Sequence, residues 1–270
     1  MTVANRTHAS HRSSRGRPTT RKTLTGLTLL LLGCLALVPA ATLAVPAVTF
    51  KSTALPIPGF RGTGNILGAG AEVEVQSTIT GTEYGGFPSP LVLLTIDSPA
   101  GTKVDANGFA TCSQSVLEAD GPSGCPKRST AGPVGEGLGI VSFGDEQVRE
   151  KVSIQGFFAP GNTLIFFVDG TSPTSLEIVE KAHWVSGTPP YGPEAVAELP
   201  LVETVPGALD ASILSFKVTI GAARKRGGRT NSYITLPKKC PRGGFPIRAE
   251  FKFFSGESTT ATYKAPCPRH

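Results

Sequence analysis

Apolar and polar residues alternate along several short stretches of this chain, and glycine and proline separate these stretches. The alternation runs through residues 72–76, 151–155, 214–220, 248–253 and 259–263. A period of two places successive side chains on opposite faces of an extended strand. Each stretch therefore predicts a half-buried antiparallel strand.

Further apolar runs predict strands at residues 91–97, 138–143, 163–168, 174–185, 194–203 and 230–236. The segment Pro160-Gly161-Asn162 predicts a hairpin turn, and residues 115–119 alone suggest a helix. About eleven short strands without a long amphipathic helix are typical of an all-β fold. We therefore predict an antiparallel β-sandwich, built as one large sandwich or two smaller ones.

Residues 1–44 have the composition of a secretory signal peptide. Six arginines or lysines and no acid precede an apolar run that ends at Ala44. This pattern predicts an N-terminal signal helix, cleavage after Ala44, and a protein secreted to the cell envelope or the extracellular space. Two alternatives place the chain on a membrane: the leader stays uncleaved as an anchor, or Cys34 carries a lipid.

The leader also accounts for the positive formal net charge of the whole chain, which is +6. Beyond residue 44 the chain has 20 bases and 20 acids, so nucleic acid is not a predicted partner. Residues 45–216 carry a net charge of −10, and residues 217–270 carry +10. This segregation marks either a surface for a polyanion or two parts that neutralise each other.

The charge reverses close to the proline- and glycine-containing segment 201–212, which has the composition of a linker. We therefore divide the chain beyond the leader into an acidic β-rich region, residues 45–204, and a basic β-rich region, residues 205–270. The two regions are either separate domains or parts of a single domain.

Four cysteines lie beyond the leader, at Cys112, Cys125, Cys240 and Cys267. An even number of cysteines in an exported protein indicates disulfide bonds. Three connectivities are possible, and we predict the pairs that are local in sequence, Cys112–Cys125 and Cys240–Cys267. The cysteines lack the C-x₂-C spacing of zinc sites, so we predict no metal site.

Histidine, the usual base in nucleophilic catalysis, is scarce, because only His183 and His270 lie beyond the leader. We therefore predict that the protein is not an enzyme and has no catalytic residue and no cofactor. The alternative is a carbohydrate-active hydrolase that uses a pair of carboxylates on a β-sandwich. Its candidate acids are Glu72, Glu74 and Glu177.

Basic residues gather on two segments of the C-terminal region. Arg224, Lys225, Arg226 and Arg229 occupy a predicted hairpin tip, and Lys238, Lys239 and Arg242 flank Cys240. Seven positive charges on connected loops predict binding to an anionic cell-wall polymer, a glycan or lipid head groups. The alternative is that these charges only keep the hairpin soluble. The oligomeric state is left open.

Five segments carry a resemblance to known proteins: IPGFRGTGNILGAG (57–70), TGTEYGGFPSP (80–90), TCSQSVLEADGPSGCPKRSTAG (111–132), LPLVETVPGALDAS (199–212) and TLPKKCPRGGFP (235–246). They resemble an uncharacterised family of secreted, Cys-Pro-containing β-rich proteins of actinobacteria. The resemblance implies export and a bacterial envelope setting, and it transfers no activity or site residue. We therefore predict a non-catalytic binding or structural role at or outside the envelope.

Overall fold

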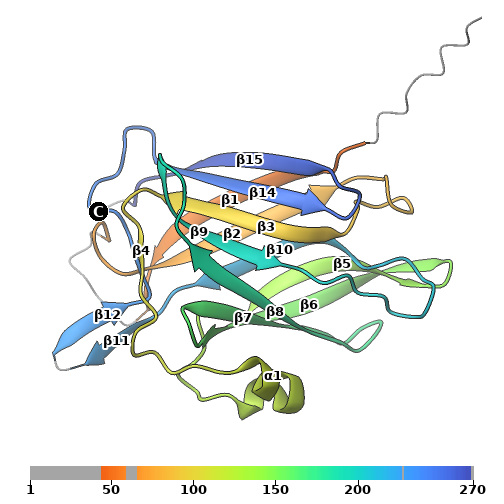
Figure 1. Cartoon of the computed structure of the whole chain (residues 1–270), viewed down its shortest axis with the longest axis horizontal. Coiled ribbons are helices and arrows are strands. Elements are labelled where there is room, and N and C mark those ends of the chain that lie inside the picture. The colour runs from red at the N-terminus through yellow and green to blue at the C-terminus, as the bar shows by residue number, and fades with distance from the viewer. Residues whose placement is uncertain (1–43, 59–65, 227, 269–270) are drawn as a thin grey trace, which may run out of the picture. The chain divides into compact units, whose positions relative to one another are not determined.

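The computed structural model describes residues 44–58, 66–226 and 228–268, most of them in β-strands (Figure 1). The predicted signal peptide and its helix, Cys34 included, lie outside these residues apart from Ala44. Within the described part of the chain, no helix has the length and apolar character needed to cross a membrane.

Eleven strands of the described chain form one sheet, in which every neighbouring pair is antiparallel. They are β1 (Ala47–Pro56), β2 (Ala71–Thr80), β3 (Leu91–Pro99), β5 (Gly135–Phe143), β6 (Glu146–Ala159), β7 (Thr163–Gly170), β8 (Leu176–Val185), β9 (Tyr191–Glu198), β10 (Ser212–Ile220), β14 (Phe245–Phe253) and β15 (Ser258–Ala265). Two short pairs stand apart: β4 (Lys103–Val104) with β13 (Ile234–Thr235), and β11 (Ala223–Arg226) with β12 (Arg229–Ser232).

The sheet curls until its two edge strands lie next to each other. Its order is β1-β2-β10-β5-β6-β7-β8-β9-β3-β14-β15, and β15 contacts β1 (Figure 1). The Thr259 hydroxyl donates to the Pro46 carbonyl at 2.8 Å, and the Phe50 and Phe251 rings meet edge-on. The all-β prediction is confirmed. A two-sheet sandwich is not confirmed, because the strands form one nearly closed, barrel-like sheet.

Strands from the acidic and the basic regions are neighbours within this sheet. Strand β10 lies between β2 and β5, and β14 pairs with β3. Lys217 forms an ion pair with Glu74 at 3.3 Å, and Arg248 with Asp97 at 2.7 Å. Each pair joins a base from residues 217–270 to an acid from residues 45–216, so the two regions neutralise each other at these points.

The segment 201–212 connects β9 to β10 and is bonded to the rest of the fold. The Ala211 amide donates to the Val202 carbonyl at 2.8 Å, and the Thr204 hydroxyl donates to the Ser142 carbonyl. The Tyr84 hydroxyl contacts the Asp210 carboxylate at 3.3 Å. Hydrogen bonds therefore attach the segment to the fold, although its composition suggested a linker.

Most predicted strands are present, but the prediction omitted β1, β4 and β11. In β1 the two middle positions on the inner face are Ser52 and Ala54, which weakens the apolar alternation. Residues 230–236 are divided between β12 and β13, and residues 199–203 lie beyond the end of β9. These elements depend on neighbouring strands more than on their own pattern.

The predicted helix at residues 115–119 lies within α1 (Gln114–Asp120), which is followed by the 3₁₀ turn η1 (Gly121–Gly124). The Ser113 hydroxyl caps α1 by accepting from the Val116 amide at 3.4 Å. Leu117 is buried in a cluster with Phe157 and other residues of β6 and β7. The helix therefore covers the outer face of these strands.

Both predicted disulfide pairings are present. Cys112–Cys125 brackets α1 and η1, and Cys240–Cys267 joins the segment before β14 to the segment after β15. The bonds close loops with sequence separations of 13 and 27 residues. A loop of that size stabilises the fold by about 3 kcal/mol in the chain-entropy model.

We expect these four cysteines to resist alkylation in the folded, unreduced protein, because their sulfurs are bonded. Peptide mapping by mass spectrometry after alkylation should find them unlabelled without reductant and labelled after reduction in denaturant. The double variant C112S/C125S should lower the free energy of unfolding by about 3 kcal/mol. Labelling of any of the four without reductant would contradict the pairing.

Candidate functional site

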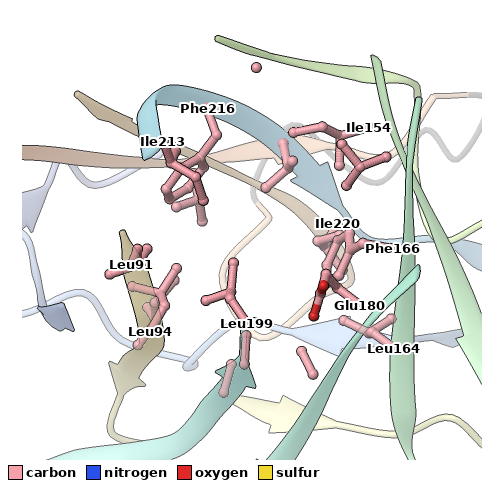
Figure 2. Close-up of a pocket in the computed structure, with 18 of the residues that line it drawn as sticks. Leu91, Leu94, Ile154, Leu164, Phe166, Glu180, Leu199, Ile213, Phe216 and Ile220 are labelled. Carbon is pink, nitrogen blue, oxygen red and sulfur yellow. The ribbon is translucent and has the colours of Figure 1, made fainter. Parts of the chain in front are cut away.

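The curled sheet encloses a cavity of about 310 Å³. Side chains from nearly every strand of the main sheet line it, and those labelled in Figure 2 converge on one space. They are Leu91, Leu94, Ile154, Leu164, Phe166, Glu180, Leu199, Ile213, Phe216 and Ile220. Its lining is almost entirely apolar, and this property suits it to a ligand.

The period of two in the strands creates this lining. In β10, Phe216, Val218 and Ile220 all line the cavity, whereas Lys217 and Thr219 between them do not. In β6, Val152 and Ile154 line it in the same way. These stretches therefore present their apolar face to the interior and their polar face outward.

Two features of the sheet leave space inside. A closed sheet of about eight strands is just filled by its own side chains, and a larger number of strands encloses a cavity. Small residues at lining positions add to this space: Ala54, Gly137, Gly139, Ala182, Ala195, Ala197 and Ser215. Aromatic residues such as Phe251 and Phe158 fill the packed clusters beside the cavity instead.

The cavity wall retains accessible apolar surface. Leu94, Phe166, Ile178 and Phe216 point inward, yet each is only half-buried. Pro200, in the connection between β9 and β10, lines the cavity and is also exposed, so this connection is a wall that faces solvent on its other side. Accessible apolar surface inside a protein favours binding of an apolar molecule.

One boundary of the cavity is formed by a buried aromatic cluster. The Trp184 indole N–H donates to the Tyr233 hydroxyl at 2.7 Å, and the Tyr233 and Phe158 ring centroids are 4.6 Å apart. Burial raises the pKa of the Tyr233 hydroxyl well above its usual range. The bond satisfies the indole N–H within this cluster, so Trp184 contributes mainly its ring to the cavity.

Two ionisable side chains, both carboxylic acids, line the cavity within the described chain: Glu150 on β6 and Glu180 on β8. Glu150 is fully buried, and its two oxygens accept hydrogen bonds from the backbone amides of Ser172 at 3.1 Å and Thr174 at 3.2 Å. Glu150 therefore fixes the connection between β7 and β8, and these bonds satisfy its carboxylate.

Glu180 differs from Glu150 because its oxygen Oε1 has no hydrogen-bond partner among the described residues. The side chain is 9% exposed, and Figure 2 shows its carboxylate between the labelled side chains of Ile220, Leu164 and Leu199. Burial among apolar groups raises its pKa to about 7, since the charged form loses hydration there. Glu180 is therefore a polar group that a ligand could contact.

The predicted basic residues lie on the β11–β12 hairpin and the chain after β13. Lys225, Lys238, Lys239 and Arg242 are exposed, and the side chains of Arg226 and Arg229 lie outside what the structure describes. Arg224 is half-buried, with its guanidinium 5.3 Å from the centroid of the Phe109 ring. Arg224 therefore contributes to packing, and the anion-binding role of the other residues stays a prediction.

The carboxylates considered for a hydrolase lie away from the cavity. Glu72 and Glu74 alternate with Val73 and Val75, which line it, so the two acids occupy the outer face of β2. Glu177 is likewise out of phase with the lining positions of β8, and so is His183. None of the three proposed acids therefore takes part in the cavity.

Glu150 and Glu180 were not among the site residues that the sequence suggested. The sequence does contain a pattern that could have identified them, because each glutamate is in phase with apolar positions of its strand: Glu150 with Val152, and Glu180 with Ile178. A charged residue within an apolar face is rare unless it is paired or functional. Assigning every position of β6 and β8 to a face would have identified both.

No group of three or more potential metal ligands is found within the described ranges. Comparison of the chain with models of protein families, with curated proteins and with solved structures finds no match. The resemblance to secreted actinobacterial proteins therefore stays a prediction, and the case for a function depends on the cavity itself.

We expect Glu180 to make the fold less stable as the pH rises. Its pKa is about 7 in the folded chain against 4.5 ordinarily, so between these values the unfolded state binds fewer protons. Stability should therefore fall from about pH 4.5 to pH 7, by about 3 kcal/mol from this group, and level off above. Urea unfolding at pH 5 and pH 8 measures the change.

The variant E180Q should lose this part of the pH dependence, because an amide does not titrate. The control E177Q changes an exposed glutamate on the opposite face of β8 and should keep it. An equal pH dependence in E180Q and the unsubstituted protein would show that Glu180 is not the buried group responsible.

Proposed function

We propose that this protein is an exported, non-catalytic binding protein that holds a small apolar molecule inside its barrel-like sheet. The observation that supports this proposal most directly is the cavity, whose apolar wall stays accessible inside the nearly closed sheet. Its volume of about 310 Å³ is at the lower end of the range of small-molecule sites. A single small ligand suits it better than a polymer.

The two disulfides support the part of the proposal that places the protein outside the cytoplasm. Two disulfides suggest an oxidising, extracytoplasmic location, since cytosolic thiols are kept reduced. An apolar molecule outside the cell needs protection from water during transport or storage, and a buried apolar cavity supplies it. Secretion by cleavage of the leader at Ala44 is part of this proposal.

The basic loops support a second element of the proposal, retention of the protein at an anionic surface of the envelope. Lys217 and Arg248 form ion pairs with acids, whereas the exposed bases Lys225, Lys238 and Lys239 have none among the described residues. Uncompensated charges on loops attract anionic wall polymers, glycans or lipid head groups through long-range electrostatics.

We expect an apolar ligand to compete for the cavity with an enlarged side chain. A197F adds a ring at a position that lines the cavity, and V196F adds the same ring on the outer face of β9. Binding of a fluorescent apolar probe, measured by titration and by equilibrium dialysis, should weaken at least tenfold in A197F and less than twofold in V196F. Equal effects of the two changes would contradict binding in the cavity.

Retention on isolated cell-wall material should depend on the basic loops. We expect the variant K225Q/K238Q/K239Q/R242Q to pellet several-fold less with this material than the unsubstituted protein at low salt. The control K51Q/K151Q/K181Q/K252Q removes the same charge from exposed strand positions and should pellet normally. At 0.5 M salt the Debye length is only about 4 Å. Retention that is changed neither by the loop substitutions nor by this salt concentration would refute electrostatic retention through the basic loops.

A further inference from the structure

We propose that Glu180 is the anchoring residue of the cavity and that the ligand is an amphipathic amine, an apolar chain that ends in a protonated nitrogen. The inference rests on the proposed function, because it specifies the class of molecule that the cavity holds. In the bound state an N–H of the ligand donates to Glu180 Oε1, and the apolar chain occupies the space among the lining side chains.

The position of Glu180 favours contact with a ligand. It lies on the inner face of β8 between Ile178 and Ala182, opposite Phe166 of β7 in the strand register, and all three neighbours line the cavity. Its carboxylate is drawn among apolar side chains in Figure 2. Its side chain is more than nine-tenths buried, and Oε1 has no partner within the described part of the chain.

A buried acceptor without a donor destabilises the fold, and a ligand can remove this cost by supplying the donor. Glu150 shows the contrast within the same lining, because backbone amides already satisfy its carboxylate. Trp184 and Tyr233 bond to each other. The Thr102 hydroxyl also lines the cavity without a partner, but it carries no charge. Of the two carboxylates in the lining, Glu180 is the one with a free acceptor atom.

The charge of the lining selects a cation over an anion. No lysine, arginine or histidine of the described chain lines the cavity, and both ionisable groups that do are carboxylic acids. A ligand carboxylate would meet no compensating charge there, whereas an ammonium would pair with ionised Glu180. A neutral alcohol would supply the hydrogen bond without the charge attraction.

The affinity for an amine should follow the ionisation of Glu180. Glu150 is the other titratable group that faces the cavity, and the charged residues of the strands around Glu180 lie on outer faces, for example Lys181 of β8, Asp169 of β7 and Glu198 of β9. An alkylamine stays protonated from pH 5 to pH 8. Its dissociation constant should therefore rise as the pH falls below about 7 and approach tenfold per unit.

The test compares three probes with the same apolar chain, decylamine, decanol and decanoate, each below its aggregation limit at pH 8. Trp184 is the single tryptophan of the chain and lines the cavity, so its fluorescence reports binding. Isothermal titration calorimetry provides an independent dissociation constant. We expect decylamine to bind at least tenfold more tightly than decanol, and decanoate to bind most weakly.

E180Q keeps the shape of the side chain and removes its charge, so it should abolish the preference for decylamine and leave the decanol dissociation constant within about threefold. E177Q, on the outer face of β8, should bind all three probes like the unsubstituted protein. Circular dichroism establishes that each variant is folded, and E180M serves as a second uncharged variant of similar size.

The outcomes separate this inference from the proposed function. If none of the three probes binds, the proposed function fails. If all three bind equally, if decanoate binds most tightly, or if E180Q and E180M retain the preference for the amine, then the cavity binds apolar molecules but Glu180 does not select an amine. Tight binding of decylamine that weakens from pH 8 to pH 5.5 only when Glu180 is present supports the inference.

Discussion

The contact between the two edge strands of the sheet is the constraint on which the rest of this structure depends. β1 and β15 come from opposite ends of the described chain and lie side by side, with the Phe50 and Phe251 rings packed beneath them. An open sheet of eleven strands would expose its apolar inner face to water. Closure places that face inside, and the cavity follows from the number of strands.

Closure also explains why two glutamates lie in an apolar interior. Each occupies a position that the strand period assigns to the inner face, so neither can reach bulk water without a change of register. Glu150 meets this constraint by binding two backbone amides of the β7–β8 connection. Glu180 has no such hydrogen bond to Oε1. Burial raises its pKa instead, and this oxygen remains available to a ligand.

Local features of the sequence predicted local features of the fold. The alternation in residues 214–220 and 248–253 identified β10 and β14, the turn Pro160-Gly161-Asn162 joined β6 to β7, and the cysteine spacing indicated both disulfides. The cavity could not be found in this way, because its lining combines positions far apart in sequence. The clustered basic residues identified the β11–β12 hairpin as a candidate site from the sequence. Glu180, in contrast, is a single residue on the apolar face of β8, so no cluster marked it.

The sequence by itself determined that this chain forms antiparallel strands and which face of most strands is apolar. The tertiary structure decided which of the three possible cysteine pairings forms. It also decided the order of the strands, the lateral closure of the sheet and the cavity within it. The physical reason is the range of the interactions: alternation and turns act between residues close along the chain, whereas closure depends on pairings such as β2 with β10 and β3 with β14. Such long-range pairings leave no periodic signal in the residues that form them.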